Sequence, residues 1–207
     1  MVFEFLIKGI VIGFSIAAPV GPIGILTIQR SITHGTWAGL ATGMGAATAD
    51  ALYGCVAGFG LTLISSWLLE IKTPVLLGGG LFLCHLGLST LKQPASQGQG
   101  GNNPIFKGYL NAYLSAFVLT LTNPMTIMAF VAIFAGLGLS GMTKGYAGAF
   151  SLVTGVFLGS CLWWGILTWG VGQLKQKLDK KFQAIINQGA GMVLLGFGFW
   201  ALIRLIP

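Results

Sequence analysis

The chain has 207 residues, of which 55% are hydrophobic and only 7% are charged. A soluble domain typically contains about 25% charged residues, so the composition excludes a water-soluble protein and predicts one that lies in a lipid bilayer. The formal net charge is +7, but no soluble domain is predicted that could present a nucleic-acid surface. We therefore interpret the basic residues as loop charges that orient membrane spans, and we expect no nucleic-acid partner.

Six apolar segments are long enough for membrane-spanning helices, which need about 20 residues with a range near 17–25. In chain order we expect them at about 3–28, 36–67, 74–91, 108–137, 143–171 and 188–206. The first segment is too long for the apolar part of a signal peptide, so we expect a retained helix. The polar stretch 92–107 is a connector, and it divides the chain into a first three-helix unit at 1–91 and a second at 108–207.

Proline interrupts the first and the fourth predicted span. Pro22 follows Gly21 in the first, and Pro124 follows Asn123 in the fourth. Proline cannot donate the backbone hydrogen bond of a continuous helix, and it suits the first position of a new helix. We expect Gly21 and Asn123 to be N-caps of half-helices whose free N–H groups attract a carboxylate. The alternative is two ordinary kinks without a ligand.

The two halves resemble each other weakly. Trp37-Ala38-Gly39 begins the second span, and Tyr146-Ala147-Gly148 lies at the start of the fifth. Three spans in each half would give homologous halves opposite orientations, as in many secondary transporters. We predict an all-α integral membrane protein with six transmembrane helices in two inverted three-helix repeats, the first and fourth helices being broken. Chance similarity between glycine-rich apolar stretches is the alternative.

Asp50 is the one acidic residue that lies well inside a predicted span. An ionisable group at membrane depth is a functional candidate by default, and Asp50 could hold a substrate ammonium group or the coupling proton. The alternative is a structural acid bonded to Thr48, Tyr53 or a partner in the second half. Tyr53 lies three residues after Asp50 and so on the same helix face, while Thr122 is polar and adjoins the second break. The predicted substrate-binding residues are Gly21, Pro22, Asp50, Tyr53, Thr122, Asn123 and Pro124, with Asp50 also coupling the proton.

Cys55, Cys84 and Cys161 each fall inside an apolar segment and form no CxxC pair. We expect no disulfide, no metal site and no cofactor. Two other functions stay open as alternatives: a divalent metal-ion exporter of similar six-helix plan, and a membrane thiol oxidoreductase. The first needs several carboxylates or a soft-ligand cluster, and the second needs reactive cysteines at equivalent places in both halves. The sequence provides neither pattern.

Small residues recur at four-residue spacing at Gly35, Gly39 and Gly43, and again at Gly155 and Gly159. This spacing is typical of close helix contacts. We favour contacts inside the chain, and a homodimer seam stays an alternative.

Counting lysine and arginine by membrane side predicts the orientation. One side has four basic residues and the other has seven, so we place the second side in the cytoplasm and both termini outside it. The first set is Lys8, Lys72, Lys144 and Arg204, and the second is Arg30, Lys92, Lys107, Lys175, Lys177, Lys180 and Lys181.

The motifs together resemble the lysine exporter (LysE/RhtB) family of amino-acid translocators over nearly the whole chain. The similar features are Gly21-Pro22, Asp50, the fourth-span stretch 121–130 and Ser160-Cys161-Leu162-Trp163-Trp164. Many family members have lysine where this chain has Met125, so the substrate preference stays open. The resemblance implies a transporter of the cell inner membrane, not an enzyme, that exports an amino acid or related metabolite driven by the proton gradient. We interpret Trp163 and Trp164 as packing or interface residues.

Overall fold

The computed structural model describes residues 2–19, 21–58, 72–92, 105–123, 125–130, 146–175, 180–203 and 205. All regular structure in these ranges is helical, as expected. The helices are α1 (Val2–Ala17), α2 (Pro22–His34), α3 (Thr36–Gly58), α5 (Lys72–Lys92), α6 (Ile105–Leu121), α8 (Tyr146–Lys175) and α9 (Lys180–Ile203). Residues 125–130 form a further short helix. The connector predicted at 92–107 is shorter than expected, because Lys92 ends α5 and residues 105–107 begin α6; its remaining part, 93–104, lies outside the described residues.

Two of the described helices are long and apolar enough to cross a membrane, at Tyr146–Leu174 in α8 and Ala184–Ile203 in α9. The pair α1 and α2 passes the same test together and is bent by 79°, which agrees with an interrupted first span. Gly108–Leu121 in α6 is a shorter apolar helix. The apolar helices fit a membrane protein, while the full set of six spans stays a prediction.

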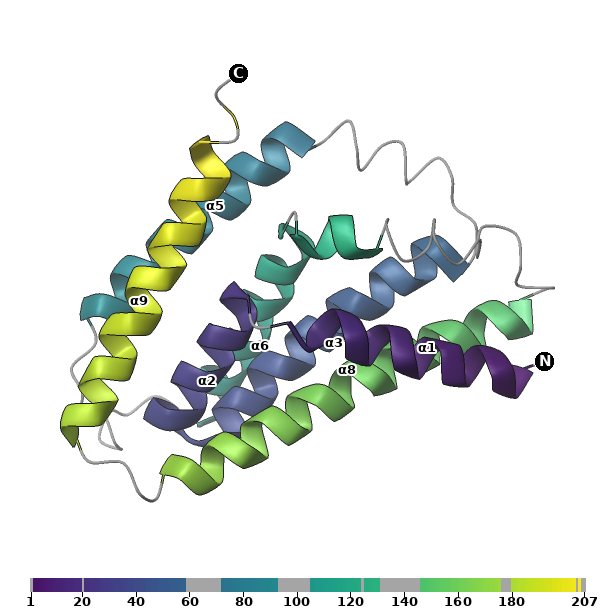
Figure 1. Cartoon of the computed structure of the whole chain (residues 1–207), viewed down its shortest axis with the longest axis horizontal. Coiled ribbons are helices and arrows are strands. Elements are labelled where there is room, and N and C mark those ends of the chain that lie inside the picture. Colours follow the sequence, from purple (N-terminus) through teal and green to yellow (C-terminus); the bar gives the residue numbers. More distant parts are fainter. Residues whose placement is uncertain are drawn as a thin grey trace.

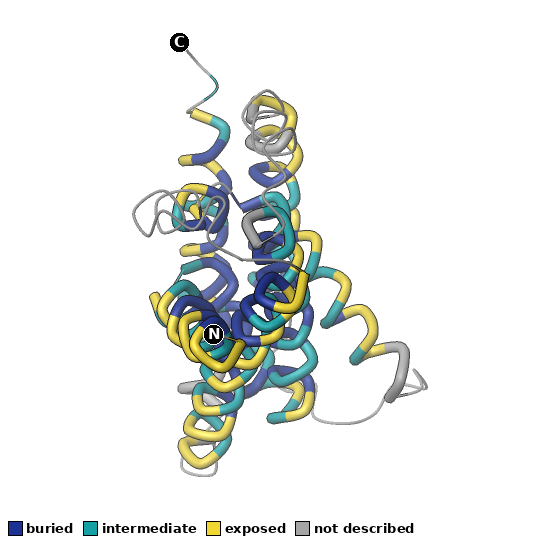
Figure 2. The backbone as a smooth tube through the Cα atoms, turned by 90° about the vertical axis from the view of Figure 1, so that its right-hand side faces the viewer, coloured by how far each residue is buried: buried dark blue, intermediate teal, exposed yellow. Residues whose placement is uncertain are grey.

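The surface of the bundle is apolar, and its mainly apolar core also contains buried polar side chains. Phe150 and Phe199 are 62% and 60% exposed, whereas Thr27 and Thr42 have no exposed area. Figure 2 shows the buried backbone gathered where the helices meet and the exposed residues on their outer sides. Apolar side chains facing outward suit contact with lipid, and polar groups in a bilayer protein gather in the bundle interior.

The helices pack in reciprocal pairs that join the two halves of the chain. α1 lies along α8, α5 lies along α9, and α3 contacts both α6 and α8 (Figure 1). The first helix of each half therefore packs on the middle helix of the other half. α2 contacts α3, α8 and α9 and so lies near the centre of the bundle.

Glycines allow these helices to approach closely. A Cβ added at Gly155 would overlap the backbone of Gly9 on α1, and one added at Gly43 would overlap Trp164 on α8. The predicted contacts inside the chain are confirmed at Gly39, Gly43, Gly155 and Gly159. Gly35 is different, because its φ of 100° suits glycine at the end of α2.

The first break has the predicted cap and proline. Gly21 is the extended N-cap of α2, Pro22 is at its start, and the Ile25 N–H donates to the Gly21 carbonyl at 3.0 Å. The first N–H groups of an α-helix, here such as that of Ile23, have no acceptor within the helix. Gly21 has no side chain that could cap them.

The prediction that the first span ends near residue 28 was wrong. α2 continues to His34, and Arg30, which was counted among the loop charges, lies inside this helix. The polar residues here do not form a loop because their hydroxyl groups bond to the preceding turn: Ser31 donates to the Thr27 carbonyl at 2.8 Å and Thr33 to that of Gln29 at 2.9 Å.

Candidate functional site

Asp50 is buried on α3 and bonded to the opposite half of the chain. Its side chain is 3% exposed, and Oδ2 accepts a hydrogen bond of 2.7 Å from the Ser160 hydroxyl on α8. The sequence left Thr48, Tyr53 or a residue of the second half as possible hydrogen-bond partners of Asp50, and the structure shows the residue of the second half, Ser160. The Thr48 hydroxyl donates to the Met44 carbonyl and the Tyr53 hydroxyl to Leu121.

Trp164 extends this contact into a chain of donors. Its indole N–H donates to the Ser160 hydroxyl oxygen at 3.1 Å, and the ring is 3% exposed. Because Ser160 accepts from Trp164, its own proton is directed to Asp50. From the sequence, Trp164 was interpreted as a packing or interface residue, and Ser160 entered only through the family resemblance. No local signal connects Ser160 with a carboxylate 110 positions earlier.

The second carboxylate oxygen of Asp50 makes no hydrogen bond to a described residue. Since every fully buried side-chain oxygen in the described part of the chain has a partner, this Oδ1 retains some accessible surface. An oxygen of this kind can accept a proton or a donor from an ammonium group.

Tyr53 lies one turn beyond Asp50 and is 6% exposed. Its hydroxyl donates to the Leu121 carbonyl, the last residue of α6, at 2.7 Å, and its ring lies 5.2 Å from that of Phe130. Tyr53 therefore contacts both helical segments that flank the second break.

Asn123 caps the helix that follows this break. Its Oδ1 accepts the Met125 N–H at 3.1 Å, and its backbone carbonyl accepts the Ile127 N–H at 3.2 Å, just as Gly21 accepts from Ile25. The predicted cap is thus present, although Pro124 itself lies outside the described residues. Thr122 is turned to its own helix, where its hydroxyl donates to the Val118 carbonyl at 2.9 Å.

Pro22 and Asp50 lie at similar depths in the bundle. α2 and α3 meet at Gly35, with Pro22 13 residues before it and Asp50 15 residues after it. At 1.5 Å per helical residue these positions are about 20 and 22 Å from the turn. The structure therefore brings Asp50 to the level of the first break, and Tyr53 to the second.

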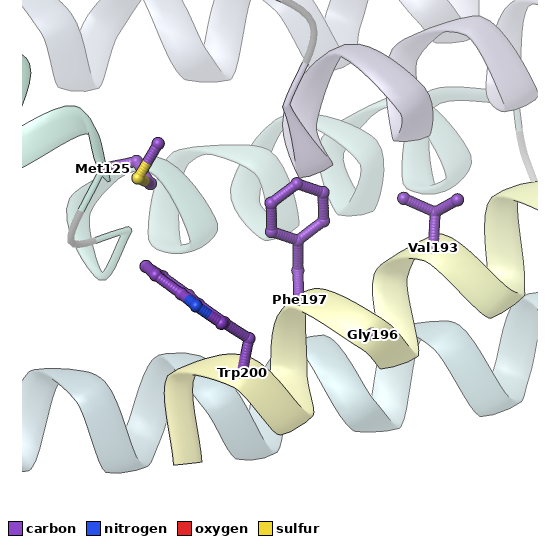
Figure 3. Close-up of a pocket in the computed structure, with 5 residues that line it drawn as sticks. All are labelled: Met125, Val193, Gly196, Phe197 and Trp200. Atoms are coloured by element: carbon purple, nitrogen blue, oxygen red, sulfur yellow. The ribbon is translucent and has the colours of Figure 1, made fainter. Parts of the chain in front are cut away.

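An apolar groove of about 380 Å³ opens beside the second break. Its walls are the side chains of Met125, Val193, Phe197 and Trp200, together with Gly196. Figure 3 shows Met125 and Trp200 facing each other across it. None of these residues carries a charge, so the walls of the groove are uncharged.

Three curated relatives resemble the chain. The Putative amino acid efflux protein YcgF of Bacillus subtilis (strain 168) is 30% identical over 198 residues, covering 92% of this chain and 91% of the relative. The Uncharacterized membrane protein YahN of Escherichia coli (strain K12) is 27% identical over 139 residues, covering 67% of this chain and 61% of the relative. The Chemotactic transduction protein ChpE of Pseudomonas aeruginosa is 23% identical over 197 residues, covering 95% and 96%. No solved structure matches the chain.

The family match covers most of the chain. The model of the family described as LysE type translocator matches residues 14–205, a range that includes both breaks, Asp50 and Ser160. The resemblance inferred from those motifs is confirmed. The chain belongs to the LysE type translocator family and is a membrane protein.

Proposed function

We propose that this protein is a secondary transporter that exports amino acids or related small metabolites by proton antiport, from a site between the two helix breaks. The observation that carries the proposal is Asp50, a carboxylate buried at the level of the first break and bonded to Ser160 at 2.7 Å. A buried acid in a bilayer protein is costly to maintain and is typical of substrate or proton pathways.

Asp50 would carry the charge exchange. One oxygen is held by Ser160, and Oδ1 is left for either a proton or the ammonium group of an amino acid. Both ligands neutralise the same carboxylate, so they compete for it. Competition of this kind couples the release of substrate on one side to the uptake of a proton.

The helix breaks would bind the substrate carboxylate. The N-terminus of a helix carries about half a positive charge, and the first N–H groups of α2 have no acceptor within the helix. The proposed substrate-binding residues at these breaks are Gly21, Pro22, Thr122, Asn123 and Pro124, the last of which lies outside the described residues. Tyr53 bonds to the end of α6 beside the second break. The apolar groove at Met125 gives the same region an uncharged wall.

The packing supports the inverted repeat that this mechanism requires. If the two halves are interchanged, α1 takes the place of α6 and α8 that of α3, so the α1–α8 contact corresponds to the α6–α3 contact. Matching Trp37 to Tyr146 places Asp50 opposite Gly159, next to Ser160, so the Asp50–Ser160 bond lies near the axis relating the halves. Rocking of one repeat against the other would expose such a site to each side in turn.

The relatives and the charge count supply the direction of transport. The name of YcgF assigns amino acid efflux to that protein, and we extend the same activity to this chain. With Arg30 left out because it lies inside α2, six basic residues against four still support an orientation with the turn at Gly35 on the cytoplasmic side of the inner membrane and both termini outside.

Uptake into everted membrane vesicles tests this function. Each labelled protein amino acid is offered to vesicles that contain the protein, with and without an acidic lumen, and vesicles lacking the protein are the control. We expect at least one amino acid to accumulate only when the gradient is present. Accumulation of none of them would contradict the proposal.

A further inference from the structure

Arg30 lies inside the bundle and is bonded only to neutral groups. Its Nη1 donates to the Thr42 hydroxyl at 3.2 Å and to the Ala112 carbonyl at 3.0 Å, and its Nη2 donates to the Ser115 hydroxyl at 2.9 Å. These partners belong to α3 and α6, so the guanidinium lies where both halves of the chain meet α2.

The charge of Arg30 has no described carboxylate beside it. Within the described residues, the ion pair that forms is the one between Lys8 and Glu4 on α1. Asp50 shares α3 with Thr42, but it lies eight residues further on, about 12 Å along the helix. A cation at membrane depth that is surrounded by neutral dipoles attracts an anion.

Two donors of Arg30 remain for such an anion. A guanidinium has five N–H groups, of which three are used. The N–H of Nε and one N–H of Nη2 make no bond to a described residue. No fully buried side-chain nitrogen in the described part of the chain lacks a partner, so Nε is accessible. Neighbouring guanidinium nitrogens are the geometry that binds a carboxylate through two hydrogen bonds.

We propose that Arg30 is a carboxylate-binding site through which the substrate passes between the Gly35 turn and the helix break at Pro22. The identity of the carboxylate as that of the substrate rests on the proposed function. Arg30 lies five residues from Gly35 and eight from Pro22, so on the predicted orientation it is reached from the cytoplasm before Asp50. One α-amino acid is too short to contact both Arg30 and Asp50 in this arrangement, so the two residues act in succession.

Acetate binding to the purified protein in detergent tests the site without assuming a substrate. The readout is the rise in melting temperature with sodium acetate, compared with neutral acetamide, at constant chloride. The variants are Arg30→Gln, which removes the charge, and Arg30→Lys, which keeps it but loses the paired donors. Ser115→Ala is the matched control, because it removes one bond of Arg30 and leaves its two unused donors.

We expect acetate to stabilise the wild type and Ser115→Ala alike. The concentration of acetate needed should rise about tenfold or more in both Arg30 variants, since charge-assisted bonds are lost. If Arg30 only connects α2, α3 and α6, the Arg30 variants and Ser115→Ala will melt lower but keep the acetate response. That result, or a wild type on which acetate has no effect, would overturn the proposal.

Transport separates this inference from the proposed function. If no amino acid accumulates in vesicles but the acetate response depends on Arg30, the exporter function fails and the anion site stands. If amino acids accumulate equally with wild type and Arg30→Gln, the exporter function stands and the place of Arg30 on the substrate path is overturned.

Discussion

At the scale of single residues, the donor chain from Trp164 through Ser160 to Asp50 determines how the buried carboxylate is held. The Ser160 hydroxyl has no exposed area, accepts from Trp164 and donates to Asp50. A hydrogen bond to a charged group contributes about 1.5–3 kcal/mol, so Ser160 should bias the charge state of Asp50 as well as its position.

Replacing Ser160 by alanine removes the hydrogen bond to Asp50. We expect the gradient-driven uptake rate to fall about tenfold or more, since one charge-assisted bond is lost. Trp164→Phe, which keeps a large aromatic ring, should cause a smaller loss of the same kind. Trp163→Phe is the control, because the Trp163 ring packs edge-on against that of Phe14, with 5.4 Å between the ring centroids, and takes no part in the hydrogen bonds to Asp50. Equal rates for Ser160→Ala and Trp163→Phe would contradict the role of Ser160.

Tyr53→Phe removes the donor to the Leu121 carbonyl at the end of α6. We expect the protein to be destabilised by about 1–3 kcal/mol, because a partly buried carbonyl loses its partner. We expect transport to fall because the second break loses its contact with α3. Thermal unfolding and vesicle uptake measure the two effects. Tyr113→Phe loses a bond to the Thr48 hydroxyl instead, and it should leave transport closer to wild type. If the two variants transport alike, Tyr53 has no special place at the break.

Several residues of the site could be predicted from the sequence because their chemistry is local. Proline and its cap specify each break, and an acid in an apolar segment is conspicuous, so Gly21, Asn123 and Asp50 were predicted as the structure places them. Ser160 was not predicted as the partner of Asp50, because only the packing of α3 on α8 brings it there. Arg30 was assigned to a loop, because its position after residue 28 in a polar stretch looked like the end of a span.

At the scale of helices, glycine allows α1 and α8 to touch through their backbones. Gly159 on α8 lies against the Ile10 backbone on α1, whereas Gly165 on the same helix has no atom within 4 Å of an added Cβ. The recurrence of glycine in the sequence predicted close contacts, but not which helices would meet. Those pairs depend on the whole arrangement of the bundle.

Gly159→Ala should lower the melting temperature by several degrees. Overpacking costs about 1–3 kcal/mol, and the overlapping atoms belong to backbone that cannot rotate away. Gly165→Ala is the matched control and should melt at or slightly above the wild-type temperature, because alanine favours the helix. The comparison is made by thermal unfolding in detergent. Equal melting temperatures would show that α1 does not pack on α8 at this glycine.

At the scale of the whole molecule, composition predicted the surroundings of the protein better than its detailed topology. The apolar exterior follows from 55% hydrophobic and 7% charged residues, whereas the polar side chains buried among the hydrophobic core residues do not. The number of spans follows less directly, because parts of the predicted second, fourth and fifth spans lie outside the described residues, and the described part of the chain contains two clear candidates and one bent pair.

The orientation can be tested on the intact chain. Alkaline phosphatase is active only outside the cytoplasm, so its fusion after Pro207 should be active, and a green fluorescent protein fusion at the same place should be dark. The reason is the excess of basic residues on the side opposite the termini. A fusion between α2 and α3, at Gly35, is the matched comparison and should behave in the opposite way. A fluorescent fusion at Pro207 would contradict the predicted orientation. The order in which substrate meets Arg30 and Asp50 would then be the opposite of the one proposed.

The most direct measurement of the central claim is gradient-driven uptake by Asp50→Asn, which keeps the size of the side chain and removes its titratable group. Everted vesicles containing equal amounts of inserted wild-type and variant protein are supplied with an amino acid that the wild type accumulates. We predict that Asp50→Asn inserts normally and shows no accumulation when the lumen is acidified. Accumulation at the wild-type rate would contradict the assignment of substrate and proton exchange to Asp50.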